Sequence, residues 1–138
     1  MQAPVSEAKI LIIDDDFFVR DFFVHTVEFG TNRHVTTFES GFHAWQCIEK
    51  APDNADVVIA DANIPDISGM ELLERVKKQF PRIVFIIMSS NPAFEKTAFQ
   101  MGADAFLSKP FDVNDLFAII HRFILAPPPP SAHETVPF

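Results

Sequence analysis

Short apolar runs alternate with longer segments of helical spacing along most of the chain. Three of the five apolar runs lack polar alternation, which is typical of strands covered on both faces. The runs lie at 9–13, 34–38, 56–60, 83–88 and 105–107, and the helical segments at about 16–29, 40–50, 69–79, 92–101 and 112–125. Because parallel strands need crossover connections, these units predict an α/β fold with a doubly wound, five-stranded parallel sheet.

Residues that favour helix ends stand where these segments change. Ser68 and Glu71 match the capping-box pattern, in which each side chain bonds to the backbone of the other residue. Asp112 is placed to cap the last helix, and Gly30 and Gly102 lie where left-handed C-terminal caps belong. These signals agree with the boundaries that the apolar pattern predicts.

A proline-rich segment follows the last predicted helix. From Ala126 the sequence reads APPPPSAHETVPF, and four consecutive prolines favour an extended polyproline conformation. We therefore interpret 7–125 as one folded domain and 126–138 as a tail or linker, with a docking motif for a partner as the alternative.

The composition is that of an ordinary globular domain. The 138 residues are 48% hydrophobic and 22% charged, and the net charge of −8 argues against a nucleic-acid-binding face. Cys47 is the single cysteine, which rules out an internal disulfide and suits a reducing compartment. The N-terminus lacks a signal-peptide layout and no apolar stretch approaches about 20 residues, so we expect a cytoplasmic protein without membrane contact.

Polar residues follow four of the predicted strands at the same end. Ligands of open α/β sheets bind beyond the carboxyl ends of the strands, so we expect these side chains to meet at one edge. They are Asp14, Asp15 and Asp16 after the first strand, Asp61 after the third, Ser89 after the fourth and Lys109 after the fifth. Clustered carboxylates repel one another unless a cation compensates, and Mg²⁺ prefers a few carboxylates together with water and phosphate oxygens.

This set of side chains suits the transfer of a phosphoryl group to Asp61. A carboxylate can act as the nucleophile toward phosphorus and form an acyl phosphate. Lys109 can bind a phosphate oxygen as a point charge, and the hydroxyl of Ser89 can donate a hydrogen bond to another. The cation and Lys109 would stabilise the charge spread over the transferred group.

The motifs at these strand ends resemble those of receiver domains of two-component response regulators, similar to the chemotaxis response regulator. The resemblance covers about residues 8–125 and rests on four stretches in order: ILIIDDD, VVIADANIPDISGMELL, IIMSS and GADAFLSKPF. It implies the flavodoxin-like (βα)5 receiver fold, with Asp61 as the phosphoacceptor. It also implies a Mg²⁺ site formed by Asp14, Asp15, Asp61 and the backbone carbonyl of Asn63.

The resemblance assigns further roles at the same edge. Ser89 matches the switch hydroxyl and Phe106 the switch aromatic, here without a phenolic hydroxyl. Asn63 and Asn91 occupy the positions that tune hydrolysis of the acyl phosphate. Lys109 matches the family lysine, and its bond to Pro110 is expected to be cis, as in relatives.

The resemblance also implies partners for a signalling domain that is not an enzyme beyond its own dephosphorylation. The phosphodonor would be a sensor histidine kinase or a histidine phosphotransfer protein, which in relatives docks on the first helix, where Phe17 and Phe18 lie. Phosphorylation would change the affinity for an output domain after residue 126, for another partner, or for a second copy. The face of helix four, strand five and helix five is the candidate surface, with apolar residues Phe99, Phe106, Val113, Leu116, Phe117, Ile119, Ile120, Phe123 and Ile124.

Two other functions remain open from the residues. Asp14 and Asp16 superficially fit the nucleophile and acid of a haloacid-dehalogenase-type phosphohydrolase, although Phe17 and Phe18 replace the small residues expected there and the chain is short for that fold. A receiver-like scaffold that is never phosphorylated is the second alternative. Ile119, where the winged-helix subgroup usually carries an arginine, argues against a dimer of that type.

Overall fold

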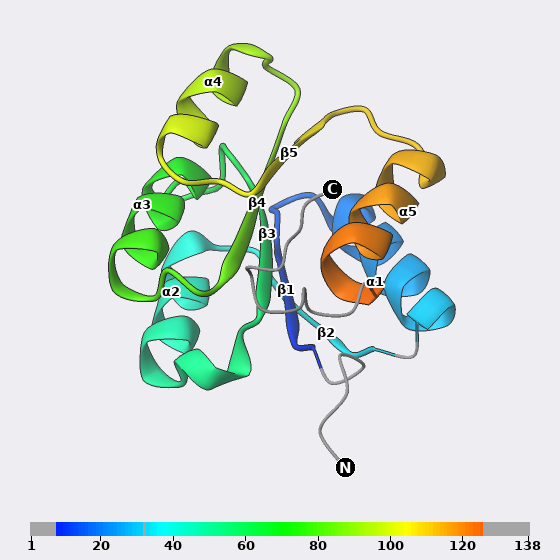
Figure 1. Cartoon of the computed structure of the whole chain (residues 1–138), viewed down its shortest axis with the longest axis horizontal. Helices are drawn as coiled ribbons and strands as arrows, with labels where there is room; N and C mark the ends of the chain where they lie inside the picture. Colours follow the sequence, from blue (N-terminus) through cyan, green and yellow to red (C-terminus); the bar gives the residue numbers. More distant parts are fainter. Residues whose placement is uncertain (1–7, 32, 126–138) are drawn as a thin grey trace, which may run out of the picture.

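The computed structural model describes residues 8–31 and 33–125 (Figure 1). The predicted tail at 126–138 lies outside these residues. Five parallel strands form one sheet in the order β2-β1-β3-β4-β5, which confirms the predicted doubly wound α/β fold. The strands are β1 (Ile10–Ile13), β2 (Val35–Phe38), β3 (Val57–Asp61), β4 (Val84–Ser89) and β5 (Ala105–Ser108).

Helices cover both faces of the sheet (Figure 1). One hydrophobic cluster joins a face of the sheet to α1 and α5, and the other joins the opposite face to α2, α3 and α4. The helices are α1 (Phe17–Thr31), α2 (Gly41–Lys50), α3 (Gly69–Gln79), α4 (Ala93–Gln100) and α5 (Val113–Ile120), with a short 3₁₀ turn η2 (Pro52–Asn54). Within the described residues, no helix is both long and apolar enough to cross a membrane.

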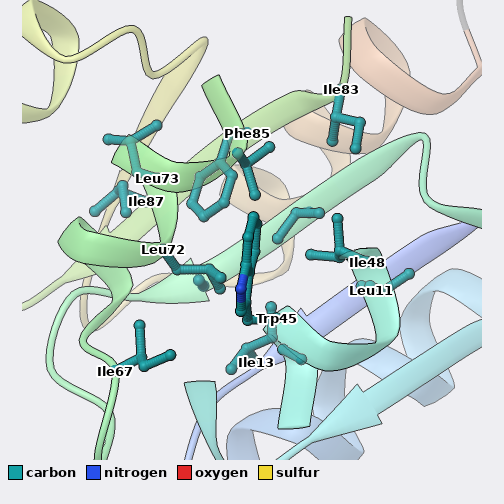
Figure 2. Packing of buried hydrophobic residues seen from close by; sticks show 14 of the residues in the cluster. Leu11, Ile13, Trp45, Ile48, Ile67, Leu72, Leu73, Ile83, Phe85 and Ile87 are labelled. Atoms are coloured by element: carbon teal, nitrogen blue, oxygen red, sulfur yellow. The ribbon is translucent and has the colours of Figure 1, made fainter. Parts of the chain in front are cut away.

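Alternation along the strands divides the core between the two faces. Leu11 and Ile13 of β1 belong to the cluster under α2 and α3, whereas Ile10 and Ile12 belong to the cluster under α1 and α5. Trp45 of α2 lies among the side chains of the cluster beneath α2, α3 and α4 (Figure 2). In β1, β3, β4 and β5, whose faces are covered, no polar side chain lies before the last residue of the strand, and the candidate site lies at these ends. The edge strand β2 differs, with Thr36 and Thr37 exposed in its middle.

Most of the predicted helix ends are confirmed. The hydroxyl of Ser68 accepts a hydrogen bond from the backbone N–H of Glu71 at 3.1 Å. The predicted return bond, from the Ser68 N–H to the Glu71 side chain, is wrong. The Glu71 carboxylate instead accepts from Arg75 at 2.7 Å. Asp112 forms a full capping box with Asp115 at the start of α5.

The two predicted glycine caps differ in outcome. Gly102 has a φ of 103°, as a left-handed cap after α4 requires. Gly30 is not a cap, because α1 continues through it to Thr31. There the threonine hydroxyl donates to the carbonyl of Val27 at 2.5 Å and accepts from the N–H of Arg33 at 3.0 Å, so the side chain of Thr31 links the last turn of the helix to Arg33.

The last predicted helix is divided in two. The α-helical part ends at Ile120, and a π-helical turn, η3 (His121–Leu125), continues it. The apolar stripe predicted along it is mostly core, because Leu116, Ile120 and Ile124 are buried beneath the helix. The exposed members of the proposed apolar surface are Phe99, Val113 and Phe117.

Phe106 and the buried residues of α5 lie on opposite faces of the sheet. The Phe106 ring packs against the cluster beneath α2, α3 and α4, whereas Leu116 and Ile120 belong to the cluster beneath α1 and α5. The predicted apolar surface is therefore divided by the edge strand β5 rather than continuous.

A polar network opposite the candidate site holds α3, β4 and the turn before β5 together. Lys77 Nζ donates to the carbonyl of Ile83 at 2.7 Å and to Asp104 Oδ2 at 2.9 Å. The same Asp104 oxygen accepts from the backbone N–H of Phe85 at 2.8 Å. The Asp104 carboxylate is thus the acceptor that the Lys77 ammonium and the Phe85 N–H share.

Replacing Asp104 with alanine should lower the free energy of unfolding by about 2 kcal/mol, because the Lys77 ammonium and the Phe85 N–H lose their shared acceptor. Urea denaturation of the two proteins measures this difference. Asp53→Ala is the matched control, since that carboxylate is fully exposed on η2 and should leave the denaturation midpoint unchanged. Equal midpoints for Asp104→Ala and the wild type would contradict the assignment.

Candidate functional site

The carboxyl ends of β1, β3 and β5 bring three charged side chains together. Lys109 Nζ donates a hydrogen bond to Asp14 Oδ2 at 2.7 Å and also contacts Asp61 Oδ2. These residues are 95 and 48 positions apart in the sequence. The exposed fractions of the side chains are 1% for Asp14, 13% for Asp61 and 18% for Lys109. The cluster is therefore nearly removed from water, and Asp61 is the more accessible carboxylate.

Backbone bonds fix the remaining carboxylate oxygens. Asp14 Oδ1 accepts from the N–H of Asp16 at 2.8 Å, and Asp61 Oδ1 accepts from the N–H of Asn63 at 2.8 Å. The N–H of Lys109 donates to the carbonyl of Ser89 at 2.9 Å, which aligns the end of β5 with β4. The Lys109–Pro110 peptide bond is cis, as the family resemblance implies.

Burial and charge act in opposite directions on the pKa values of Asp14 and Lys109. Burial raises the pKa of Asp14, although hydrogen bonds from Lys109 and from the Asp16 backbone oppose that shift. Burial acts to lower the pKa of Lys109, but its hydrogen bonds to Asp14 and Asp61 outweigh burial, so the net shift raises its pKa. Both raised pKa values favour the protonated form of the group, as expected where carboxylates are desolvated together.

The start of α3 packs directly on the backbone that carries Asp61. A Cβ atom at Gly69 would lie 2.0 Å from the carbonyl oxygen of Asp61, so no larger residue fits without moving β3. The N–H of Gly69 donates to the carbonyl of Ala62 at 3.0 Å, and Ser68 caps the helix. Helix and strand thus fix the position of the candidate nucleophile together.

The acidic residues supply hard oxygen ligands of the kind that Mg²⁺ binds. Asp15 is exposed beside the buried Asp14, and Asn63 is exposed two residues after Asp61. Across residues 8–31 and 33–125, no three Asp, Glu, His or Cys side chains are close enough to hold a metal ion by themselves. Magnesium commonly uses one or two carboxylates together with waters and phosphate oxygens, so the donor set still fits it.

The predicted switch and tuning residues lie at neighbouring strand ends. Ser89 is buried, and its hydroxyl accepts from the N–H of Asn91 at 3.0 Å. Asn91 is exposed, and its side chain accepts from the N–H of Ala93 at 3.0 Å in the turn that leads into α4, whose N-cap is Pro92. Phe106 lies one strand away on β5 and is partly buried. The backbone bond between Ser89 and Lys109 links these residues to the charged cluster.

Arg20 supports the cluster and was not predicted from the sequence. Its Nη1 donates to the backbone carbonyl of Asp14 at 2.8 Å, and its Nη2 lies 3.7 Å from the Glu39 carboxylate. The guanidinium therefore holds the loop between β1 and α1 in place. The sequence signal is an arginine in the first turn of a helix that follows the acidic loop.

Asp66 is a second residue that the sequence interpretation missed. Its φ of 62° is left-handed, a conformation that aspartate tolerates better than most residues. Its Oδ1 accepts from the N–H groups of Ile67 and Phe42, and its Oδ2 accepts from the Ser40 hydroxyl at 2.8 Å. Asp66 thus ties the loop after Asp61 to the start of α2, which the Pro-Asp turn sequence could have suggested.

Phe17 and Phe18 open α1 beside the acidic loop. Both rings are exposed, and their centroids lie 5.6 Å apart in an edge-to-face arrangement. Both side chains therefore lie on the surface of the domain and neither is packed in the core. Their predicted role as docking contacts remains a prediction.

Comparisons with known proteins agree with this geometry. Residues 10–121 match the family model described as response regulator receiver domain. The DNA-binding transcriptional regulator NtrC of Escherichia coli is 30% identical over 117 residues, which are 83% of this chain and 24% of that protein. The putative two-component response regulator ARR13 of Arabidopsis thaliana is 26% identical over 90% of this chain and 22% of its own length. This chain thus spans about a quarter of the length of these relatives.

Solved structures of receiver domains have the same fold as this chain. A response regulator receiver domain protein from Clostridium thermocellum superposes with a TM-score of 0.77 at 30% identity, covering 86% of this chain and 94% of that one. The chemotaxis response regulator CheY4 of Vibrio cholerae superposes with a TM-score of 0.75 at 28% identity, covering 85% of this chain and 98% of that one.

The bonds of Asp66 predict a pH-dependent contribution to stability. The hydrogen bond from the Ile67 N–H, with those from Ser40 and Phe42, holds the pKa of Asp66 below its usual value. A carboxyl group with a lowered folded-state pKa stabilises the fold above its unfolded pKa and loses that contribution as pH falls through the folded pKa. Asp66→Asn removes the charge but still tolerates a positive φ.

We expect the difference in unfolding free energy between wild type and Asp66→Asn to be largest at pH 5–7 and to shrink below about pH 4. Urea denaturation at a series of pH values measures it. A difference that stayed constant down to pH 3 would show that the charge of Asp66 does not contribute.

Proposed function

Because this chain belongs to the response regulator receiver domain family of two-component signalling, we propose that Asp61 is its phosphoacceptor. Accepting a phosphoryl group is the general function of the family. The observation that carries the residue assignment is the contact of Asp61 with Lys109 at the end of β3. Asp14 contacts the same lysine but is buried, so a donor reaches Asp61 more easily.

The transfer follows from the contacts of the two side chains. A carboxylate oxygen of Asp61 attacks phosphorus, and a new P–O bond forms as the bond from phosphorus to the donor nitrogen breaks. The donor imidazole leaves with the electron pair of that bond. Lys109 turns from Asp61 Oδ2 to a phosphoryl oxygen, while the Asn63 N–H keeps Oδ1 in place. Asp14 holds the other side of the Lys109 ammonium throughout.

Receiver domains bind Mg²⁺ in general, and we infer that this one holds it with Asp14, Asp15, Asp61 and the Asn63 carbonyl. The supporting observation is the chemistry of the donors, which are hard oxygen ligands around a partly buried carboxylate. When bound, the cation would neutralise charge on the transferred phosphoryl group. Asp15 is exposed, so it could bind an ion without breaking the pair between Asp14 and Lys109.

The proposed switch passes through Ser89 and Phe106. At present the Ser89 hydroxyl accepts a hydrogen bond from the Asn91 N–H. A phosphoryl group on Asp61 would attract this hydroxyl and break that bond. Phe106 would then move inward, and its ring would lose no hydrogen bond on burial because it carries no hydroxyl. Asn63 and Asn91 are exposed near Asp61 and Ser89 and would set how quickly water hydrolyses the acyl phosphate.

The partners follow from the family. Receiver domains interact with histidine kinases and output domains, so we propose a histidine kinase or a histidine phosphotransfer protein as the donor. The output would be a domain after residue 126, or a partner or second copy at the face of α4, β5 and α5. We assign 7–125 to the receiver domain, 126–138 to a tail or linker, and the protein to the cytoplasm.

The phosphoacceptor assignment predicts a mass change that depends on one residue. Treatment with acetyl phosphate and Mg²⁺ should add about 80 Da, the mass of one phosphoryl group, to the wild type and nothing to Asp61→Asn. Intact-mass spectrometry measures the adduct. Asp53→Asn is the control, since Asp53 is an exposed carboxylate on η2 and should leave labelling unchanged. Equal labelling of Asp61→Asn and the wild type would rule out Asp61.

The metal assignment predicts stabilisation by Mg²⁺. At about ten times its dissociation constant, Mg²⁺ should raise the melting temperature by about 3–6 °C, because it binds the folded protein and relieves carboxylate repulsion. Asp15→Asn should remove most of this shift. KCl at equal ionic strength controls for screening. An Asp15→Asn protein that kept the full magnesium-specific shift would refute Asp15 as a ligand.

A further inference from the structure

A pocket of about 410 Å³ opens beside the charged cluster. Its walls are mainly apolar and come from the first turns of α1 and from the loop between β5 and α5. Phe18, Phe22 and Phe111 supply aromatic surface, and Lys109 lies at one end. The volume falls within the range of small-molecule pockets, about 300–1,000 Å³, and is ample for one aromatic ring.

The aromatic wall is held in place from behind. The ring of Phe111 lies 5.5 Å from the buried Phe23 and 6.0 Å from Phe22, measured between centroids. Phe18 is fixed at its backbone, where its N–H donates to Asp16 Oδ1 at 2.8 Å. Its side chain is 78% exposed and contributes little to the core. Core packing therefore accounts for Phe22 and Phe111, whereas packing gives no reason for the exposed ring of Phe18 beside them.

The pocket adjoins the candidate phosphorylation site through Lys109. Lys109 lines the pocket and also contacts Asp61. A phosphodonor whose phosphoryl group reaches Asp61 and Lys109 can therefore place the rest of its structure against Phe18 and Phe111. Besides Lys109, the polar residues that line the pocket are Asp16 and Ser90, and the Asp16 carboxylate disfavours a donor that carries a second negative charge there.

We propose that this pocket binds a planar aromatic leaving group of the phosphodonor, so that the domain uses aromatic phosphodonors more efficiently than aliphatic ones of the same class. The proposal rests on the proposed function of Asp61 and adds a specificity for the donor. The ring belongs either to an aromatic acyl phosphate or to the imidazole of a phosphohistidine, and both present a flat face to the aromatic wall.

The reaction is the same transfer with each donor. A carboxylate oxygen of Asp61 forms a bond to phosphorus, and the bond from phosphorus to the leaving atom breaks. The leaving atom keeps the electron pair, so benzoyl phosphate releases benzoate and N-phosphoryl imidazole releases imidazole after taking up a proton from water. The pocket contributes binding of the ring and takes no part in bond breaking.

The test compares three donors on the full chain. Benzoyl phosphate and N-phosphoryl imidazole carry a ring, and acetyl phosphate carries none. The initial rate of mass gain is measured against donor concentration for wild type, Phe18→Ala and Phe29→Ala. Phe29 is the matched control because it is an exposed phenylalanine on the same helix, 88% exposed against 78% for Phe18, and lies outside the pocket. Comparing each donor between variants cancels its intrinsic reactivity.

Phe18→Ala should lower the efficiency of ring-bearing donors about three- to tenfold, mainly through weaker donor binding, and should leave acetyl phosphate unchanged. Phe29→Ala should match the wild type with every donor. Loss confined to benzoyl phosphate would identify the ring of a small molecule as the occupant, and loss confined to N-phosphoryl imidazole would identify the ring of a phosphohistidine.

A parallel measurement without chemistry uses phenylphosphonate and methylphosphonate as unreactive probes. Phenylphosphonate should shift the backbone NMR resonances of Phe18 and Phe111, and methylphosphonate should not. Equal donor efficiencies in Phe18→Ala and the wild type, with no such shift, would overturn the pocket while leaving Asp61 as the acceptor. Failure of all three donors to label Asp61 would instead overturn the proposed function.

Discussion

The ammonium of Lys109 between two carboxylates is the interaction on which the candidate site depends. Burying Asp14 without a partner would cost several kcal/mol, and a nearby unpaired Asp61 would add repulsion. One cation compensates both groups, although the three residues are far apart in the sequence. A parallel sheet satisfies this constraint because its strands all end at the same edge.

The two carboxylates have different surroundings, which is why we propose different roles for them. Asp14 is buried, its backbone carbonyl is held by Arg20, and its side chain is paired with Lys109, so it acts as a fixed counter-ion. Asp61 keeps some exposure at the mouth of the site, next to a pocket with aromatic walls. The proposed acceptor role of Asp61 requires both a fixed backbone and access for the donor, and Asp61 has both.

Apolar periodicity predicted the strands, the helices and the convergence of Asp14, Asp61 and Lys109, because each depends on regular patterns. Periodicity does not predict which of several nearby partners a polar side chain bonds to. Thr31 ends α1 where Gly30 was expected, and Glu71 pairs with Arg75 rather than completing a capping box. The support that Arg20 gives the acidic loop depends on the spatial position of a carbonyl, which a linear pattern does not encode.

The most direct test of the central interaction is a double-mutant cycle between Lys109 and Asp14 on the free energy of unfolding. Lys109→Met and Asp14→Asn should each destabilise the protein, and the double variant should be at least about 1 kcal/mol more stable than the sum of the single effects predicts. Single effects that add to within about 0.3–0.5 kcal/mol would contradict the account, because two groups held together in a buried pair cannot behave independently.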